Sequence, residues 1–282
     1  MKIGILPYQH RLTGKLADVP VSKLRWPLGD VEMEGTVGDL GADDHLLLYP
    51  KSGYFWDPRP GVQCRVSILI AEPFAVQRRN YLAAIALQRR FHRIITHRPF
   101  MARWAGNALV MPFGGAWVEP RSDGPLEKKR NMSLIASAKT ELEGHRLRHE
   151  IARWCADGDR DVDLLGLAYR QIDRKEDGLV PYRYSVVIEN SREEGYFTEK
   201  LVDSLLCDTL PIYWGAPDID RYFDPDGMLI CQSAAEIMAA IQSATPELYG
   251  SKLAAVAANR ERALAYVDYE ANAAEALLKQ NA

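Results

Sequence analysis

Short apolar runs recur along the first half of the chain, and helical or polar stretches separate them. Arg65–Ala71 is mostly apolar, which is typical of a strand buried on both faces of a parallel sheet. Phe74–Arg90 follows with apolar residues at helical spacing. The pattern predicts strands at Lys2–Leu6, His45–Tyr49, Arg65–Ala71, Phe91–Thr96 and Ala108–Met111.

The second half repeats this alternation after a charged, Pro- and Gly-containing stretch at residues 118–131, which has the composition of a linker. Helices are expected at Gly144–Cys155, at Thr198–Leu206 and in the Ala-rich tail after Ala234, with breaks at Pro246 and Gly250. The predicted strands are Ser133–Ala136, Val162–Gly166, Tyr184–Ile188, Leu210–Tyr213 and Met228–Cys231. Such alternation predicts two Rossmann-like α/β domains with parallel sheets facing an interdomain cleft.

Composition narrows the functional classes. The 282 residues carry a formal net charge of −3, so no overall basic excess indicates a nucleic-acid or anionic-lipid partner. The four Cys form no CxxC motif, and no apolar run reaches the ~18 residues of a membrane span. The apolar run at the N-terminus is too short for a signal peptide, because Pro7 already ends it. We therefore expect a cytoplasmic protein without a transmembrane segment, and peripheral contact with the inner face of the membrane stays open.

The most informative stretch follows the predicted strand that ends at Ile188. This strand delivers Glu189 and Asn190 to the sheet edge where open α/β sheets place their ligands. A helix then begins with Thr198 as its cap, and Lys200 lies in its first turn. Helix N-terminus and ammonium together indicate a phosphate site. The alternative to a phosphate site is that Lys200 is a solvated surface residue and that Glu199 only interacts favourably with the helix dipole.

Three ordered motifs in this stretch resemble the signature of the family 10 glycosyltransferases, the α-1,3/1,4-fucosyltransferases. The family pattern is Phe-Glu-Asn-Ser, then Tyr-Val-Thr-Glu-Lys, then a Val/Ile-Pro-Val/Ile-Tyr-x-Gly-x-Pro turn. The departures Ile188, Phe197 and Leu210 are all apolar. The matching segments are Ile188–Ser191 (IENS), Tyr196–Lys200 (YFTEK) and Leu210–Pro217 (LPIYWGAP).

The resemblance implies a GT-B fold whose C-terminal domain binds GDP-fucose. By position in the motif, Lys200 would contact the diphosphate. Tyr196 and Glu199 would contact the nucleotide sugar, and Glu189 and Asn190 would lie at the donor site.

The family also has a diphosphate-binding Arg on the first helix of the donor domain. Arg146 best matches it, with Arg148 as the alternative because the register is uncertain by a turn. An Arg and a Lys converging on the departing diphosphate would stabilise its developing charge. The competing interpretation is a basic, solvated helix face.

An inverting transfer also needs a general base for the acceptor hydroxyl. Glu72 directly follows a predicted strand, and its Ile70–Pro73 context resembles the family's Gly-Glu-Asn turn, with Ala and Pro replacing Gly and Asn. The alternative is a partner for the helix that starts near Phe74. His97, Arg98 and Trp104 follow the next strand and are candidate acceptor-binding residues, or else a core Trp and surface polar residues.

No metal or other cofactor is required by this scheme. The Asp-x-Asp spacings at Asp157–Asp159 and Asp161–Asp163 are interpreted as a turn and a strand edge. The predicted organisation is an acceptor domain over residues 1–120, a donor domain over 121–262 and a helical tail over 263–282 that packs on the N-domain or mediates association.

The leading hypothesis is an inverting transfer of L-fucose from GDP-fucose to a glycan hydroxyl, with lipopolysaccharide or another surface glycan as acceptor. One alternative is another GDP-sugar donor. The other is a non-catalytic nucleotide-sugar-binding protein on the same fold.

Overall fold

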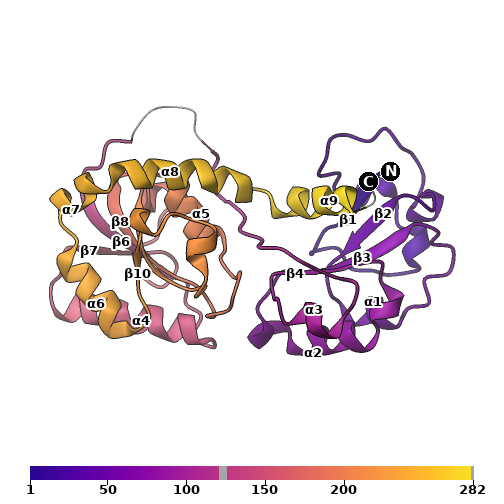
Figure 1. The fold of residues 1–282 in the computed structure, drawn as a ribbon, viewed down its shortest axis with the longest axis horizontal. Coiled ribbons are helices and arrows are strands. Elements are labelled where there is room, and N and C mark those ends of the chain that lie inside the picture. The colour runs from indigo at the N-terminus through magenta and orange to yellow at the C-terminus, as the bar shows by residue number, and fades with distance from the viewer. Residues whose placement is uncertain (121–125, 281–282) are drawn as a thin grey trace. The chain divides into compact units, whose positions relative to one another are not determined.

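The computed structural model describes residues 1–120 and 126–280. The chain forms two compact units (Figure 1). Unit 1 combines Met1–Phe113 with Tyr269–Ala282, and unit 2 is Gly114–Asp268. In the described part of the chain, each unit holds one five-stranded sheet in which all neighbouring strands are parallel.

The unit 1 sheet runs in the simple order β1-β2-β3-β4-β5. Its central strands are buried along almost their whole length, which explains their mostly apolar sequences. The strands are β1 (Ile3–Leu6), β2 (His45–Leu48), β3 (Arg65–Ile70), β4 (Ile94–Thr96) and β5 (Ala108–Val110).

Helices cover both faces of this sheet. On one face, α1 (Ser52–Trp56), α2 (Phe74–Ala86) and α3 (Met101–Trp104) supply core residues such as Phe55, Tyr81 and Met101. The other face is covered by α9 (Tyr269–Lys279), whose Ala273, Ala274 and Leu277 are fully buried with side chains of β1, β2, β3 and β4. The C-terminal helix therefore completes the core that the N-terminal strands begin.

The unit 2 sheet has the order β10-β9-β8-β6-β7. Because β7 and β8 lie on opposite sides of β6, the strand order reverses between β6 and β8, and such a switch point is the usual ligand position in open α/β sheets. The strands are β6 (Arg130–Ile135), β7 (Val162–Leu165), β8 (Tyr182–Ile188), β9 (Leu210–Trp214) and β10 (Leu229–Ile230).

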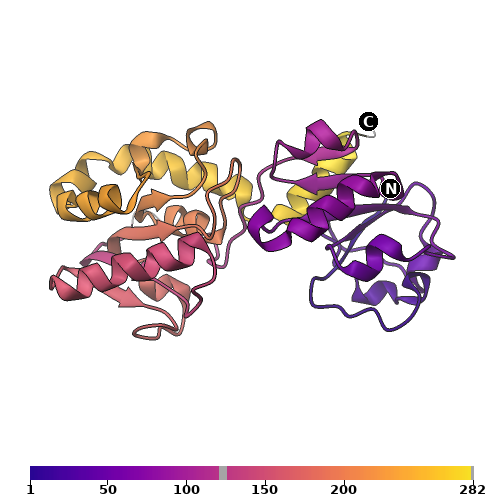
Figure 2. The same cartoon turned by 90° about the horizontal axis from the view of Figure 1, so that it is seen from below.

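Two helical layers enclose the unit 2 sheet, as the two views show (Figures 1 and 2). Core residues of α4 (Glu143–Asp157) and α6 (Ala234–Ser243) pack on one face, joined by α7 (Pro246–Ser251). Core residues of α5 (Glu199–Leu206) belong to the opposite cluster, together with Ala263 at the end of α8 (Leu253–Ala263). Every helix in the described residues is too short or too polar to cross a membrane.

Single 3₁₀ turns occupy much of the remaining chain. They are η1 (Leu16–Asp18), η2 (Val21–Lys23), η3 (Val37–Asp39), η4 (Gln88–Arg90), η5 (Lys175–Gly178), η6 (Ile219–Arg221), η7 (Pro225–Gly227) and η8 (Leu264–Tyr266). The turns η1, η2 and η3 lie between β1 and β2, where the sequence pattern predicted neither a strand nor a helix. Helices α1 and α3 were also missed, because helices of four or five residues carry no readable periodicity.

All ten predicted strands overlap strands of the described residues, but the units divide elsewhere than predicted. The predicted divisions were 120/121 and 262/263, and residue 121 lies outside the described residues. The observed divisions are Phe113/Gly114 and Asp268/Tyr269. Gly115 donates its N–H to the Tyr266 carbonyl oxygen at 2.7 Å, and the Trp117 N–H bonds to Asp203 at 2.9 Å. These bonds hold the segment after Phe113 to unit 2.

Candidate functional site

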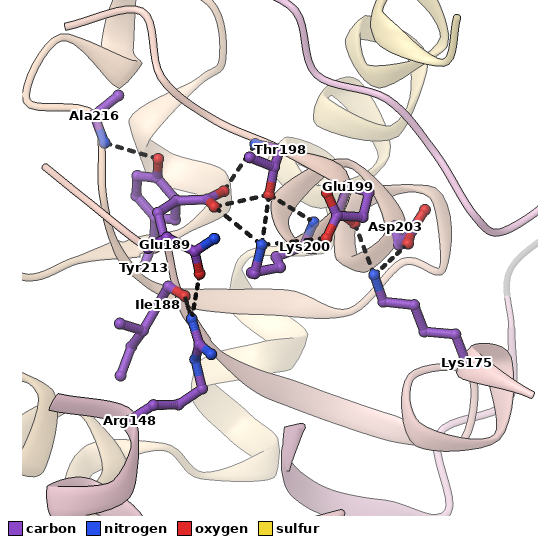
Figure 3. A network of polar contacts seen from close by, with 11 residues as sticks. Arg148, Lys175, Ile188, Glu189, Thr198, Glu199, Lys200, Asp203, Tyr213 and Ala216 are labelled. Atoms are coloured by element: carbon purple, nitrogen blue, oxygen red, sulfur yellow. Dashed lines mark hydrogen bonds and ion pairs between the residues drawn. The ribbon is translucent and has the colours of Figure 1, made fainter. Parts of the chain in front are cut away.

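Glu189 is the centre of a polar network at the carboxyl end of β8 (Figure 3). Its side chain is fully buried. One carboxylate oxygen accepts the Thr198 N–H at 2.8 Å, and the other accepts the Thr198 hydroxyl at 2.7 Å. Lys200 Nζ lies 3.6 Å from the same carboxylate. Glu189 therefore fastens the first turn of α5 to the sheet and acts as a positioning group.

Thr198 caps α5 as the sequence predicted, since its Oγ1 accepts the Lys200 N–H. The Lys200 ammonium turns back over this cap, 3.0 Å from Thr198 Oγ1 and 3.2 Å from Glu199 Oε1. Burial opposes the charge of Lys200, but Glu189 and Glu199 outweigh it and raise the pKa. Lys200 is thus a charged, three-quarters buried ammonium at a helix N-terminus, a position that suits an anion.

A second lysine, Lys175 of η5, supports the same helix from the other side. Its Nζ lies 2.6 Å from Asp203 and donates to the Glu199 carbonyl oxygen at 3.2 Å. Burial works against ionisation of Glu199, yet Lys200 and Lys175 lower the pKa of its carboxyl. Neither Lys175 nor Asp203 could be predicted from the sequence, because no motif links a loop lysine to an aspartate 28 positions away.

Arg148 lies in this region and Arg146 does not. Arg148 is buried and donates through Nη2 to the Ile188 carbonyl oxygen at 2.6 Å and to Asn190 Oδ1 at 3.2 Å. Its buried Nε has no hydrogen-bond partner among the described residues. Arg146 is exposed and donates to the Glu141 carbonyl oxygen. Arg146, which the sequence favoured, therefore faces solvent. Side chains two positions apart on a helix point ~200° away from each other, so Arg146 and Arg148 lie on opposite sides of α4.

Helix α4 approaches β8 closely enough to bring Arg148 there. The Gly144 N–H donates to the Asn190 carbonyl oxygen at 3.2 Å. A Cβ at Gly144 would stand 1.7 Å from the Glu189 carbonyl oxygen, so only glycine fits. Tyr196 is buried close to this point, where its hydroxyl contributes to the electrostatic environment of Arg148.

The predicted residues of unit 1 lie around the carboxyl ends of β3 and β4. Glu72 follows β3 and is exposed, while its carbonyl oxygen accepts the Tyr81 hydroxyl at 3.0 Å. His97 follows β4, is buried, and meets the Phe113 ring edge-on at 6.0 Å. Because neighbouring parallel strands end at one sheet edge, Glu72 and His97 share that edge.

Arg98 and Trp104 occupy the surface beside this edge. The Arg98 guanidinium lies over the Phe74 ring at 4.8 Å. Trp104 ends α3 and is 59% exposed. The alternative of a core Trp with a surface His is therefore wrong: His97 is buried and Trp104 is exposed.

The aspartates at 157–163 have structural roles. Asp157 ends α4, and Asp163 in β7 pairs with Arg130 at 2.7 Å and with Arg170 at 3.3 Å. Within residues 1–120 and 126–280, no group of three or more His, Cys, Asp or Glu side chains is arranged to hold a metal ion.

Comparison with protein-family models finds no match. Two curated proteins share similarity with part of the chain. An α-(1,3)-fucosyltransferase, FucT, from Helicobacter pylori is 37% identical over 54 residues, which is 19% of this chain and 11% of that protein. A putative fucosyltransferase-like protein from Arabidopsis thaliana is 26% identical over 110 residues, 38% of this chain and 21% of that protein. The aligned part spans a tenth to a fifth of these relatives.

Solved structures share the fold over most of the chain. An α1,3-fucosyltransferase with GDP matches with a TM-score of 0.51 at 17% identity, covering 75% of this chain and 72% of that one. Part of the chain is thus similar in sequence to fucosyltransferases, and the chain shares the fold of a solved α1,3-fucosyltransferase. An α1,3-fucosyltransferase with GDP-fucose matches with a TM-score of 0.51 at 16% identity, covering 77% of this chain and 70% of that one. The structure of S. aureus TarM matches with a TM-score of 0.60 at 10% identity, covering 85% of this chain and 55% of that one.

The fold is that of the GT-B glycosyltransferases. Two of the three motifs quoted from the sequence meet directly, because Glu189 of the first accepts both hydrogen bonds from Thr198 of the second. Tyr213 of the third motif is fully buried, and its hydroxyl accepts the Ala216 N–H at 2.9 Å. The motifs thus converge on the carboxyl edge of the unit 2 sheet.

Proposed function

We propose that the chain is a glycosyltransferase that uses GDP-fucose as donor and transfers L-fucose to a hydroxyl of a glycan. The observation that carries the proposal is the network in which Arg148 and Lys200 flank the Glu189–Asn190 segment at the switch point. These residues belong to, or lie beside, the motifs shared with the fucosyltransferases. Lipopolysaccharide or another surface glycan is the proposed acceptor.

In this proposal Arg148 and Lys200 contact the diphosphate. Arg148 replaces Arg146 in that role because it is the buried arginine and its Nε is unpartnered among the described residues. Asn190, Tyr196 and Glu199 surround the nucleotide sugar. Glu189 lies at the donor site and holds the α5 cap in place, since its carboxylate accepts both hydrogen bonds from Thr198.

Glu72 is the proposed general base of an inverting transfer. The acceptor oxygen attacks the anomeric carbon of fucose as its proton passes to the Glu72 carboxylate. The bond from that carbon to the diphosphate oxygen breaks, and the departing GDP takes the electron pair. The two cations stabilise the charge that develops on it. His97, Arg98 and Trp104 are the proposed contacts for the acceptor.

No metal ion is assigned in this scheme, since Arg148 and Lys200 supply the positive charge. Transfer after dialysis against EDTA should match transfer in excess Mn²⁺ or Mg²⁺. A loss of more than about tenfold that the metal restores would contradict the assignment.

Ligand binding to the full chain tests the donor directly. Melting curves with GDP, GDP-fucose, GDP-mannose and UDP-glucose should show stabilisation by GDP and GDP-fucose, because ligands that bind only the folded state raise its stability. Stabilisation by GDP-mannose but not by GDP-fucose would show that the donor sugar is mannose and not fucose. Stabilisation by UDP-glucose alone would overturn the proposal.

The base is tested with Glu72→Gln, which keeps the side-chain volume and removes the proton acceptor. Donor binding should stay at the wild-type level, while transfer to a glycan acceptor falls by about 10²–10⁴-fold. Glu261→Gln, at an exposed position on α8, is the matched control. Wild-type transfer by the Glu72 variant would remove Glu72 from the mechanism.

A wild-type protein that binds GDP-fucose but neither transfers nor hydrolyses it over a panel of glycans would instead be a binding protein on this fold.

A further inference from the structure

Residues 73–113 of unit 1 contain seven arginines and no Lys, Asp or Glu. The chain as a whole has 35 basic and 38 acidic residues, so its small negative charge conceals this local excess. The segment covers α2, η4, β4, α3 and β5. Positive charge is therefore concentrated in this segment of unit 1.

Helix α2 displays part of this charge on its outer side. Arg78, Arg79 and Leu82 are exposed, while Tyr81 and Ala84 face the core. Arg89, seven positions after Leu82, is also exposed and lies in the η4 turn that continues α2. Because residues three and four positions apart are neighbours on a helix, Arg78, Arg79 and Leu82 form one stripe on α2.

Helix α3 and the residues just before it lie next to this stripe. The Arg98 guanidinium lies 4.8 Å from the Phe74 ring and 5.9 Å from the Phe100 ring, and Phe100 lies 6.1 Å from Trp104. At the far end, Gln88 Nε2 donates to the Trp104 carbonyl oxygen at 3.0 Å. These contacts run from the start of α2 to its end, so α2 and α3 form one continuous surface, with α3 labelled beside α2 in Figure 1.

Large apolar side chains stand exposed among these arginines. Their exposed fractions are 48% for Val76, 50% for Leu82, 38% for Phe100 and 59% for Trp104. We define the basic–aromatic face as these four residues together with the exposed arginines of α2, η4 and α3. It consists of Val76, Arg78, Arg79, Leu82, Arg89, Phe100, Arg103 and Trp104.

We propose that the basic–aromatic face binds the surface of a bilayer that contains anionic phospholipids. Guanidinium groups attract anionic headgroups, and Trp, Phe and Leu side chains gain free energy at the boundary between headgroups and acyl chains. A soluble polyanion would use the arginines but would leave Val76 and Leu82 in water. The mixture of both residue types favours a lipid surface, and the inference does not depend on the proposed donor.

Vesicle flotation of the full chain tests this inference. The protein should float with vesicles of 70% phosphatidylcholine and 30% phosphatidylglycerol, and stay unbound with phosphatidylcholine alone. Arg79→Glu/Arg89→Glu should weaken binding about 25-fold or more, since each basic residue at an anionic surface is worth roughly fivefold. The matched control is Arg153→Glu/Arg262→Glu, which changes the charge equally at two exposed positions of unit 2.

The apolar part is tested with Val76→Ser/Leu82→Ser, which keeps every charge. Binding should fall about tenfold or more, whereas Leu253→Ser/Leu264→Ser, at exposed positions of unit 2, should bind as the wild type does. Circular dichroism and melting curves confirm that each variant is folded. These variants lie outside the residues proposed for transfer, so GDP binding reports the other hypothesis separately.

Three results would overturn the inference. They are absence of binding to the anionic vesicles, equal binding to phosphatidylcholine alone, and equal losses in the face and control variants. If the wild type binds heparin but no vesicles, and Arg79→Glu/Arg89→Glu does not bind heparin, the partner is a soluble polyanion instead.

Discussion

At the residue scale, Lys200 and Arg148 carry charge next to Glu189, but different groups hold them. Lys200 sits against two carboxylates, Glu189 and Glu199, whereas Arg148 is held by a carbonyl and an amide oxygen. Removing Lys200 therefore takes away the ion-pair partner of a fully buried carboxylate. A single substitution would mix this structural cost with any loss of ligand binding, so the two effects need separate variants.

Lys200→Met should destabilise the protein by about 3 kcal/mol, because it removes the ammonium that forms an ion pair with the buried Glu189. The double variant Glu189→Gln/Lys200→Met should recover most of that loss in urea denaturation. Both variants should bind GDP about 10–100-fold more weakly in calorimetry, as expected for a lost charge-assisted hydrogen bond. Wild-type GDP affinity in the double variant would show that Lys200 only stabilises unit 2.

His45 gives a pH-dependent contribution to stability. Its ring is fully buried in β2 at 4.9 Å from the His92 ring, and neither nitrogen has a hydrogen-bond partner among the described residues. Burial, reinforced by His92 and Arg65, lowers the pKa of His45 to about 4. The folded chain therefore resists protonation, whereas the unfolded chain accepts a proton near its ordinary pKa of ~6.5.

Because the unfolded state binds more protons, stability should fall as the pH falls from about 6.5 toward 4. His45 alone should account for about 2 kcal/mol of loss by pH 5. Urea denaturation of the wild type and His45→Phe at pH 7 and pH 5 measures this. The variant should lose about 2 kcal/mol less than the wild type over that interval, and identical losses would contradict the assignment.

At the element scale, the site depends on how closely α4 packs against β8. The helix begins at Glu143, and Gly144 hydrogen-bonds to Asn190 one residue beyond Glu189. This approach lets Arg148, one turn later, reach the Ile188 carbonyl oxygen. Sequence periodicity could place the helix over Gly144–Cys155, but it could not tell which arginine faces the strand.

Gly144→Ala should push the start of α4 away from β8, because its Cβ would overlap the Glu189 carbonyl oxygen. We expect a loss of about 3 kcal/mol in stability and weaker GDP binding. Gly250→Ala in α7 is the control, since a Cβ there meets nothing within 4 Å. It should leave stability unchanged or raise it by up to about 1 kcal/mol. Similar melting temperatures for the two variants would rule out the close packing.

At the scale of the whole molecule, the chain crosses from unit 1 to unit 2 and returns. Tyr269–Lys279 leaves unit 2 and packs on the face of the unit 1 sheet opposite α2. Tyr49, after β2, hydrogen-bonds to both Tyr269 and Glu270. The stability of the N-terminal sheet therefore depends on residues more than 200 positions away.

Leu277→Ala should destabilise unit 1 by about 3 kcal/mol, because it opens a cavity under the sheet. Amide exchange should accelerate in β1, β2 and β3 and stay unchanged in β8 and β9. Leu278→Ala changes the neighbouring residue, which is partly exposed, and should cost less than about 1 kcal/mol. Faster exchange in unit 2 instead would show that α9 does not belong to unit 1.

The sequence alone determined the parallel α/β class, the ten strand positions in the described chain and the Thr198 cap. Fully buried strands must be apolar throughout, and a cap needs a hydroxyl at one position, so both leave local signals. The ordered motifs around Glu189, Thr198 and Tyr213 also indicated the fucosyltransferase relatives without any coordinates.

Only the tertiary structure decided which groups meet. It brought Arg148 rather than Arg146 to β8, buried His97 and exposed Trp104, and paired Lys175 with Asp203. It also assigned residues 269–280 to unit 1 and placed α3 beside α2. Each of these contacts joins segments that are distant in sequence, or depends on the rotation of a helix about its axis. Local patterns of hydrophobic and polar residues carry neither kind of information, because packing between elements sets both.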